Sequence, residues 1–237
     1  MSTPLLEVKD IDTYYGTSQA LFGMDFQIRA GQFVTLLGRN GMGKSTSIKS
    51  IVGLMTPARG SIRFAGQDIN GLPSYKIARA GIGLVPEGRQ IFPNLSVQEN
   101  LVATAHNRQN SASPWSLEKI YGLFPRLSER SGNLGSNLSG GEQQMLAIGR
   151  ALMTNPKLLI LDEATEGLAP IIRTEIWRCL AELKKTGLTI ICIDKNLNSL
   201  LPLADQHYIV EKGSVVWAGS SDELSNQREQ LQSYMGV

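Results

Sequence analysis

The stretch F-V-T-L-L-G-R-N-G-M-G-K-S spans Phe33–Ser45 and joins an apolar run to a glycine-rich turn. Apolar residues at positions 48, 51 and 52 then follow with helical spacing. The last eight letters, Gly38–Ser45, match the pattern G-x-x-x-x-G-K-[S/T] between a strand and a helix. In that pattern backbone N–H groups point at phosphate oxygens, and the helix N-terminus adds partial positive charge. The stretch predicts a nucleotide phosphate site, because a chance glycine turn does not require four specified positions in this context.

Individual residues of this stretch have expected roles in binding a nucleotide and Mg²⁺. Lys44 is expected to reach the β- and γ-phosphates, and the Ser45 hydroxyl to bind Mg²⁺. Thr46, one residue further into the helix, is expected to assist at the phosphates. The remaining phosphate contacts are assigned to the loop at Gly38, Asn40, Gly41 and Gly43.

A second apolar run, L-L-I-L-D-E at Leu158–Glu163, ends in two carboxylates. Ligands of open α/β sheets bind at the carboxyl ends of the strands, so both carboxylates are expected at the nucleotide. Asp162 is the candidate Mg²⁺ ligand, directly or through water, and Glu163 is the candidate general base for the attacking water. An acidic pair after a strand is by itself more typical of a solvated turn. Its combination with the Gly38–Ser45 loop favours the catalytic interpretation.

Strand and helix patterns alternate along much of the chain. The clearest helix starts at Pro170 and ends in Lys184 and Lys185, and the flanking strands complete a strand–helix–strand unit typical of a parallel α/β sheet. Strand patterns vanish between about 87 and 157, which predicts an inserted α-helical subdomain at 87–157 and an ATP-binding core of 1–86 and 158–237. The predicted strands are Leu5–Val8, Phe33–Leu37, Ser61–Phe64, Ile82–Val85, Leu158–Leu161, Thr189–Ile193, Tyr208–Val210 and Val215–Ala218, and the predicted helices of the insertion are Val97–Thr104, Leu117–Phe124 and Glu142–Met153.

The composition argues against several classes of protein. The chain has 237 residues, 42% of them hydrophobic and 19% charged, with a net charge of +2. That balance suits one globular domain or two tightly fused subdomains, and it argues against a disordered chain or an electrostatic nucleic-acid binder. Apolar runs stay far below the roughly 18 residues of a membrane span, and no signal-peptide pattern is present, so the cytoplasm is the expected compartment. Cys179 and Cys192 lack metal-site spacing and are expected to be reduced core residues.

The string L-S-G-G-E-Q-Q at Leu138–Gln144 opens a predicted helix and resembles the signature motif of ATP-binding-cassette (ABC) ATPases. With the two motifs above, the resemblance covers essentially the whole chain. It implies a P-loop NTPase fold, with a RecA-like mixed sheet, an antiparallel N-terminal part and a helical insertion, and it implies ATP and Mg²⁺ as ligands. It also implies that Ser139, Gly140 and Gly141 bind the γ-phosphate of an ATP held by a second subunit. A capping box of Ser139 and Glu142 is an additional interpretation that leaves the two glycines unexplained.

The same resemblance assigns Tyr15 to stacking on adenine, against the alternative of a core aromatic. Three positions depart from the usual family pattern. Glu87 stands where a Gln usually binds Mg²⁺ and contacts the attacking water, and Ala169 stands where an Asp usually closes the loop after the catalytic Glu. Lys195, or Asn196 if the alignment shifts by one, stands where a His usually contacts the γ-phosphate.

The strings V-P-E-G-R, I-F-P and G-L-A-P resemble one branch of the family, the smaller ATP-binding subunit of branched-chain amino acid importers. That branch implies an ATPase at the cytoplasmic face of the membrane that works with two permease subunits and, indirectly, with a solute-binding protein. Its second ATPase subunit is usually a paralogue, and a homodimer is the alternative. Related branches import urea, amides or other small carboxylates, so the solute stays open.

The departures at Glu87, Ala169 and Lys195 leave a rival interpretation, a nucleotide-binding regulatory subunit that does not turn ATP over. An ABC ATPase of DNA repair or translation is disfavoured, because the chain has one cassette and no long heptad run. A groove bordered by Glu87–Pro93 and the polar loop 106–114 is expected to receive a permease helix. Phe92 and Pro93 are the apolar candidates for that contact, and core packing is the alternative for Phe92.

Overall fold

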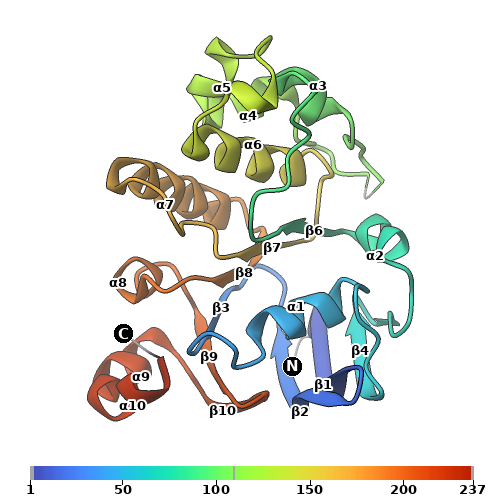
Figure 1. Ribbon diagram of the computed structural model, residues 1–237, viewed down its shortest axis with the longest axis vertical. Helices are drawn as coiled ribbons and strands as arrows, with labels where there is room; N and C mark the ends of the chain where they lie inside the picture. The colour runs from blue at the N-terminus through green and yellow to red at the C-terminus, as the bar shows by residue number, and fades with distance from the viewer. Residues whose placement is uncertain (1–2, 109, 236–237) are drawn as a thin grey trace.

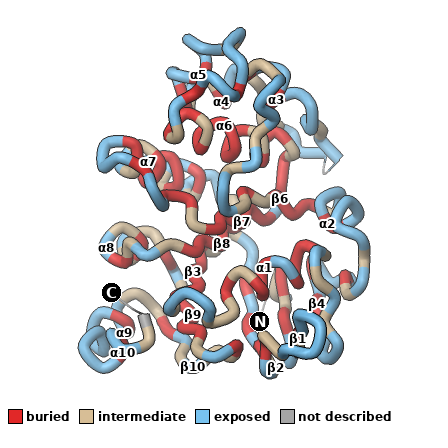
Figure 2. Tube along the Cα trace, viewed as in Figure 1, coloured by how far each residue is buried: buried red, intermediate tan, exposed pale blue. Residues whose placement is uncertain are grey.

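Six strands form the central sheet of the computed structural model, which describes residues 3–108 and 110–235 (Figure 1). The strand order is β10-β9-β3-β8-β7-β6, and the neighbours from β9 to β6 are parallel while β10 is antiparallel to β9. Every residue of β3, β7 and β8 is buried, because layers cover both faces of the sheet (Figure 2). The strands are β3 (Phe33–Leu37), β6 (Ile82–Val85), β7 (Leu158–Asp162), β8 (Thr189–Ile193), β9 (Gln206–Glu211) and β10 (Ser214–Gly219).

A second, antiparallel sheet of four strands, in the order β2-β1-β4-β5, comes from the N-terminal part of the chain. Together with α1 (Lys44–Ile51) it packs against one face of the central sheet, so that Leu158 and Ile160 belong to the core on this side. Its strands are β1 (Leu6–Tyr15), β2 (Ser18–Ile28), β4 (Arg59–Phe64) and β5 (Gln67–Asp68).

The strand prediction for Leu5–Val8 was too short, and β2 was missed. The pairing of β1 with β2 shifts register three times between Val8 and Tyr14, and Asp10 and Gly23 have positive φ. Such bulges interrupt the alternation of apolar and polar residues from which strands are predicted. The sequence pattern therefore showed only the regular first part of a ten-residue strand.

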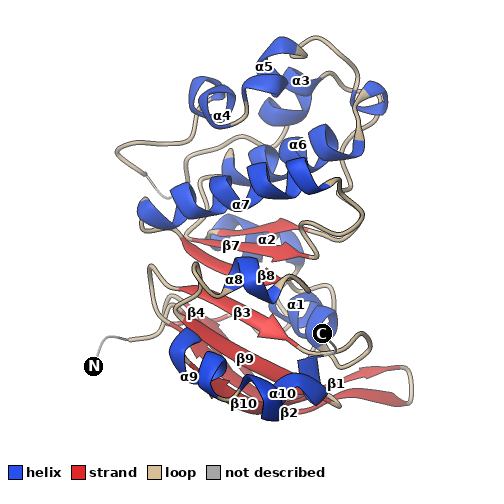
Figure 3. Ribbon diagram, turned by 90° about the vertical axis from the view of Figure 1, so that its left-hand side faces the viewer, coloured by secondary structure: helices blue, strands red, loops and turns tan. Residues whose placement is uncertain are grey.

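The other face of the central sheet carries α6 and α7, and further helices pack over α6 (Figure 3). Between residues 87 and 157 the described residues hold helices and no named strand. Gly149 lets this layer pack closely, because a Cβ there would lie 2.9 Å from Leu101 Cδ2 and 3.0 Å from Ile120 Cγ2. The helices are α3 (Val97–Val102), α4 (Leu117–Leu123), α5 (Pro125–Glu129), the 3₁₀ turn η1 (Gly135–Asn137), α6 (Gly140–Leu152) and α7 (Pro170–Lys185).

Helix α7 begins and ends as predicted, and it buries Cys179 with its apolar stripe. Cys179 and Cys192 are both free and buried, as expected for core thiols. No helix of the described part of the chain is long and apolar enough to cross a membrane. Residues 1–2, 109 and 236–237, which fall within the predicted core and the loop 106–114, lie outside the described residues. The remaining helices are α2 (Ser74–Ala80), α8 (Leu197–Leu200), α9 (Ser221–Asn226) and α10 (Arg228–Met235).

A buried histidine ties the central sheet to the C-terminal helices. His207 on β9 is fully buried, with Thr35 Oγ1 2.6 Å from Nδ1 and Ser221 Oγ 2.8 Å from Nε2. The Ser221 hydroxyl also lies 2.9 Å from the carbonyl oxygens of Leu201 and Ala204, so its one proton is donated there and it accepts from Nε2–H. Burial lowers the pKa of His207 to about 4, and the imidazole is neutral in the folded protein.

We expect the free energy of unfolding to fall by about 3 kcal/mol as the pH drops from 6.5 to 4 because of His207 alone. The folded-state pKa lies below the unfolded value, so the unfolded chain binds the extra proton in this window and stability is lost as the pH falls. Urea unfolding at a series of pH values measures it. In the variant His207→Gln, the free energy of unfolding should depend less on pH between 6.5 and 4. An unchanged pH dependence would contradict the role of His207 in this loss of stability.

Candidate functional site

The loop Gly38–Ser45 joins β3 to α1 in the conformation that its glycines permit. Gly38 and Gly43 have φ of 138° and 105°, a region that other residues rarely adopt. A Cβ at Gly38 would lie 2.3 Å from the Val210 carbonyl oxygen, whereas one at Gly41 would meet nothing within 4 Å. Gly38 is therefore required by packing against β9, and the backbone at Gly41 has open space in front of it.

The ammonium of Lys44 lies inside this loop. It donates hydrogen bonds to the carbonyl oxygens of Gly38 at 2.6 Å and Arg39 at 2.8 Å, and the residue is only 8% exposed. Burial lowers the pKa of Lys44, and the nearby charges of Glu163 and Asp162 oppose this effect. A cation held in this way is poised for an anion that enters the loop.

A hydroxyl and a carboxylate meet beside the lysine. The Ser45 hydroxyl donates to Asp162 Oδ1 at 3.3 Å, and Asp162 is 7% exposed. Burial raises the pKa of Asp162, because the charged carboxylate loses solvation by water at this position. Mg²⁺ prefers oxygen ligands and keeps several water or phosphate ligands, so these two side chains fit it. The described residues contain no group of three or more His, Cys, Asp or Glu that could hold a metal, so water and phosphate oxygens would complete the coordination.

Glu163 stands immediately after β7 with φ of 55°, a strained conformation for a residue with a side chain. Its backbone N–H donates to the Ile193 carbonyl at 2.9 Å, which fixes the residue against β8. It lines a small pocket together with Lys44 and Asn40. A hydrogen bond with Glu166 and then burial raise the pKa of Glu163 to about 7. A carboxylate with a pKa near the working pH is well suited to accept a proton.

The residues at the departing positions differ in how they lie relative to this pocket. Lys195 lines it, and its Nζ lies 2.7 Å from Glu166 Oε1. Asn196 instead accepts a hydrogen bond from the Ser199 N–H and caps α8. Glu87 is exposed, and its charge contributes to the raised pKa of Asp162. Glu87 and Lys195 thus follow the carboxyl ends of the parallel strands β6 and β8, whereas the Asn196 side chain caps α8.

Tyr15 lies beside the phosphate loop rather than in the core. Its side chain is 49% exposed, and its hydroxyl is 3.4 Å from Thr46 Oγ1. The Lys49 ammonium stands 5.8 Å from the ring centroid. An exposed ring at this position is accessible for stacking on a base.

The signature motif lies apart from the phosphate loop in the structure. Ser139 and Glu142 form the predicted capping box at the N-terminus of α6. A Cβ at Gly141 would lie 2.7 Å from Ile172 Cγ2, so this glycine is required by the packing of α6 against α7. Figures 1 and 3 both show α6 and α1 on opposite sides of β7. Ser139, Gly140 and Gly141 are therefore not part of the site built around the same chain's Lys44.

A sequence profile described as ABC transporter matches residues 21–166. The chain belongs to the ABC transporter family. It is 42% identical over 232 residues to the high-affinity branched-chain amino acid transport ATP-binding protein BraG of Pseudomonas aeruginosa, covering 98% of this chain and 100% of that protein. It is 31% identical to the lipopolysaccharide export system ATP-binding protein LptB of Escherichia coli K12, covering 98% and 97%.

Solved structures agree with this family. A nucleotide-free ATP-binding cassette from an ABC transporter superposes with a TM-score of 0.83 at 28% identity, covering 96% of both chains. The ADP conformation of another ATP-binding cassette gives a TM-score of 0.81 at 28% identity, covering 98% of this chain and 97% of that one. The present cassette is thus an ATPase subunit of the type that works with a partner ATPase and with transmembrane components.

Two residues of this cassette that lie outside the sequence motifs contact them. Glu166 binds both Glu163 and Lys195. Arg89 has φ of 64°, and its guanidinium covers the start of α6, where a Cβ at Gly140 would lie 2.9 Å from Nη1. No sequence pattern predicts the contact of Glu166 with Lys195 or that of Arg89 with α6, because each of these two contacts joins segments far apart in the chain.

Proposed function

We propose that this chain hydrolyses ATP as the energy-coupling subunit of an importer for branched-chain amino acids. The full-length similarity to BraG supports this solute class over the lipopolysaccharide export of the LptB relatives, because the identity is higher over the same length. The observation that carries the hydrolytic role is the convergence of Lys44, Ser45, Asp162 and Glu163 at the ends of β3 and β7.

In this proposal each residue has one part in the reaction. Lys44 and the loop N–H groups hold the β- and γ-phosphates, and Tyr15 stacks on the adenine. Glu163 accepts a proton from the water that attacks the γ-phosphorus, as the bond to the ADP oxygen breaks. Ser45 and Asp162, with Glu87 nearby, would hold Mg²⁺, which would supply positive charge at the phosphates. Ser139, Gly140 and Gly141 contact the γ-phosphate of the ATP that the second ATPase subunit holds. Their counterparts in the second subunit contact the ATP of this chain, since the signature motif does not reach the phosphate loop of its own chain.

The proposed assembly contains a second ATPase subunit, a paralogue or a second copy, and two transmembrane permeases. A solute-binding protein delivers the solute to the permeases, and the ATPase lies at the cytoplasmic face of the plasma membrane. Closing of the two ATPases around ATP and their reopening after hydrolysis drive the permeases between two states.

Purification of the chain with its partners from the native membrane tests this proposal. Permeases, a second ATPase and a solute-binding protein that binds leucine, isoleucine or valine are the expected companions. A binding protein for urea, amides or another solute would reassign the substrate, and export partners would contradict the role in import.

A regulatory subunit that binds ATP without turning it over is the second candidate. The departures from the usual family pattern at Glu87, Ala169 and Lys195 are the observation that favours it. Steady-state phosphate release from the purified complex separates the two candidates. Tight ATP binding with no release, in the presence of a catalytic partner subunit, would favour the regulatory role.

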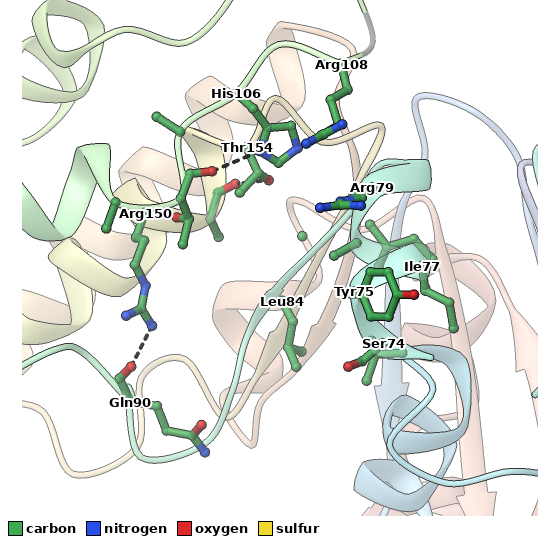
Figure 4. Close-up of a pocket in the computed structure, with 18 of the residues that line it drawn as sticks. Ser74, Tyr75, Ile77, Arg79, Leu84, Gln90, His106, Arg108, Arg150 and Thr154 are labelled. Carbon is green, nitrogen blue, oxygen red and sulfur yellow. Dashed lines mark hydrogen bonds between the residues drawn. The ribbon is translucent and has the colours of Figure 1, made fainter. Parts of the chain in front are cut away.

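The proposed permease contact is a groove of about 790 Å³ between α2, β6 and the end of α6. Three of the large hydrophobic side chains that the protein exposes line it, namely Leu54, Tyr75 and Phe92. Figure 4 shows Arg150 on one side of the groove and Arg79 and Tyr75 on the other. A helix with apolar and acidic side chains fits such a surface.

Phe92 has the central position in this proposal. Its ring lies under the Arg150 guanidinium at 4.7 Å and remains 41% exposed, so it is not a core residue. Pro93 is also exposed but is not among the residues that line the groove.

We expect Phe92→Ala to weaken assembly with the permeases about fivefold or more, since a buried aromatic anchor contributes more than about 1 kcal/mol. Pull-down of the permeases at a series of concentrations of this ATPase measures the affinity of assembly. Val216→Ala is the matched control, because Val216 is 46% exposed on β10, away from the groove. Equal assembly of both variants would rule out docking at Phe92.

A further inference from the structure

Lys195 stands between two places where its ammonium can find a negative charge. It lines the small pocket that Gly38, Asn40 and Lys44 share, which is the phosphate side. It also lines a wider pocket of about 470 Å³ with Glu166 and Arg173. In the structure the ammonium lies on the second side, with Nζ 2.7 Å from Glu166 Oε1.

The carboxylate of Glu166 is held where it can compete for this cation. Glu166 belongs to the segment that leads from β7 to α7. The Thr165 side chain and N–H both donate to Asp194 Oδ2, at 2.6 Å and 3.1 Å, so this segment is tied to the one that carries Lys195. Glu166 also shares a hydrogen bond with Glu163. One exposed carboxylate therefore contacts two of the side chains assigned to the reaction.

The ion pair is weak enough to be exchanged. Both side chains are about half exposed, at 55% for Lys195 and 50% for Glu166. Exposed pairs of this kind contribute little, and a lysine ammonium on a flexible stem can change partner without losing a fixed geometry. A γ-phosphate placed beside Lys44 carries more charge than one carboxylate and lies on the other side of the same ammonium.

We propose that Glu166 is a positioning residue that holds Lys195 away from the phosphate pocket, and that the γ-phosphate of ATP displaces it. This inference rests on the proposed ATPase function and adds a role for a residue outside the three sequence motifs. When the triphosphate binds, Lys195 moves to the γ-phosphate and Glu166 is released. ADP has no γ-phosphate, so with ADP the Lys195–Glu166 pair stays closed. The pair thereby lowers the affinity for ATP without changing that for ADP.

Equilibrium binding of β,γ-imido-ATP and of ADP to the full chain, by calorimetry, tests this role without reference to turnover. We expect Glu166→Gln to tighten binding of the imido analogue about two- to fivefold and to leave ADP unchanged, which is the range for one exposed ion pair. Lys195→Gln should weaken analogue binding. In the Lys195→Gln background, Glu166→Gln should then have no further effect.

The pair of Lys185 and Glu182 on α7 provides a matched control. It is also exposed, with 2.8 Å between Nζ and Oε1, and it lies at the end of the helix away from this pocket. Glu182→Gln should leave the affinity for both nucleotides unchanged. Thermal unfolding of each variant shows that the fold is retained, as expected for exposed side chains.

Two results would overturn the role of Glu166. One is an equal change of ADP and analogue affinity in Glu166→Gln, and the other is a change that persists without Lys195. Failure of the proposed ATPase function would give a different experimental result. A chain that binds the analogue with the expected Glu166 effect but releases no phosphate from ATP within the complex is not an ATPase. A chain that binds no nucleotide contradicts both.

Discussion

Glu163→Gln is expected to lower ATP turnover by about 10²- to 10⁴-fold, the usual contribution of a general base. Glutamine has the same shape as glutamate but does not accept a proton from the attacking water. The residue lines the pocket that holds Lys44, and its pKa is raised to about 7, so removal of its basicity acts on the reacting water itself. Phosphate release by the assembled complex measures the loss.

Nucleotide binding separates this effect from misfolding. The variant should bind ATP as tightly as the wild type, because phosphate contacts come from Lys44 and the loop. Retained turnover in Glu163→Gln would remove Glu163 from the role of base. Loss of both turnover and binding would indicate that the strained backbone at Glu163, with φ of 55°, depends on the native side chain.

Lys44→Ala is expected to weaken ATP binding by about 100-fold or more. Hydrogen bonds to a charged group contribute about 1.5–3 kcal/mol each, and Lys44 is assigned to two phosphates. Lys44 is 8% exposed, and its ammonium lies inside the loop, where it donates to the carbonyl oxygens of Gly38 and Arg39. Titration with a fluorescent ATP analogue gives the dissociation constant.

A lysine outside the site supplies the control for this experiment. Lys185→Ala removes the same charge from the exposed end of α7 and should leave the dissociation constant unchanged. If Lys44→Ala bound ATP normally, the loop Gly38–Ser45 would not be the phosphate site. A similar loss in both variants would point to a general electrostatic effect of net charge instead.

The parts of the site that could be predicted are those whose geometry is encoded within a few residues. The phosphate loop was predicted because its glycines, its lysine and its serine lie within eight positions of each other, between one strand and one helix. The start of α6 was predicted on the same basis, from a serine and a glutamate three residues apart. Helix α7 followed from a proline start, an apolar stripe and a lysine end.

Contacts that depend on strand order could not be predicted. Glu166 and Lys195 are 29 positions apart and meet only because β7 and β8 are adjacent and parallel, with Asp162 paired to Ile193 at their carboxyl ends. The bulges of β1 and the length of β2 also depend on pairing partners, because register shifts are properties of two strands together. From its sequence neighbours, Phe92 could be either a core or a surface residue. The structure leaves it 41% exposed, with its backbone held by Asn100 and its ring beside the Arg150 guanidinium.

The sequence by itself determined the chemistry of this protein: a phosphate loop, a carboxylate pair after a strand and a helix start rich in glycine. Each is a local feature, and the backbone conformations that it needs are set by its own residue types. Only the tertiary structure decided which side chains face each other across the site, above all that Lys195 pairs with Glu166 and that the signature helix lies away from its own chain's Lys44. The physical reason is that strand order and layer packing are settled by the whole core, and no short segment contains that information.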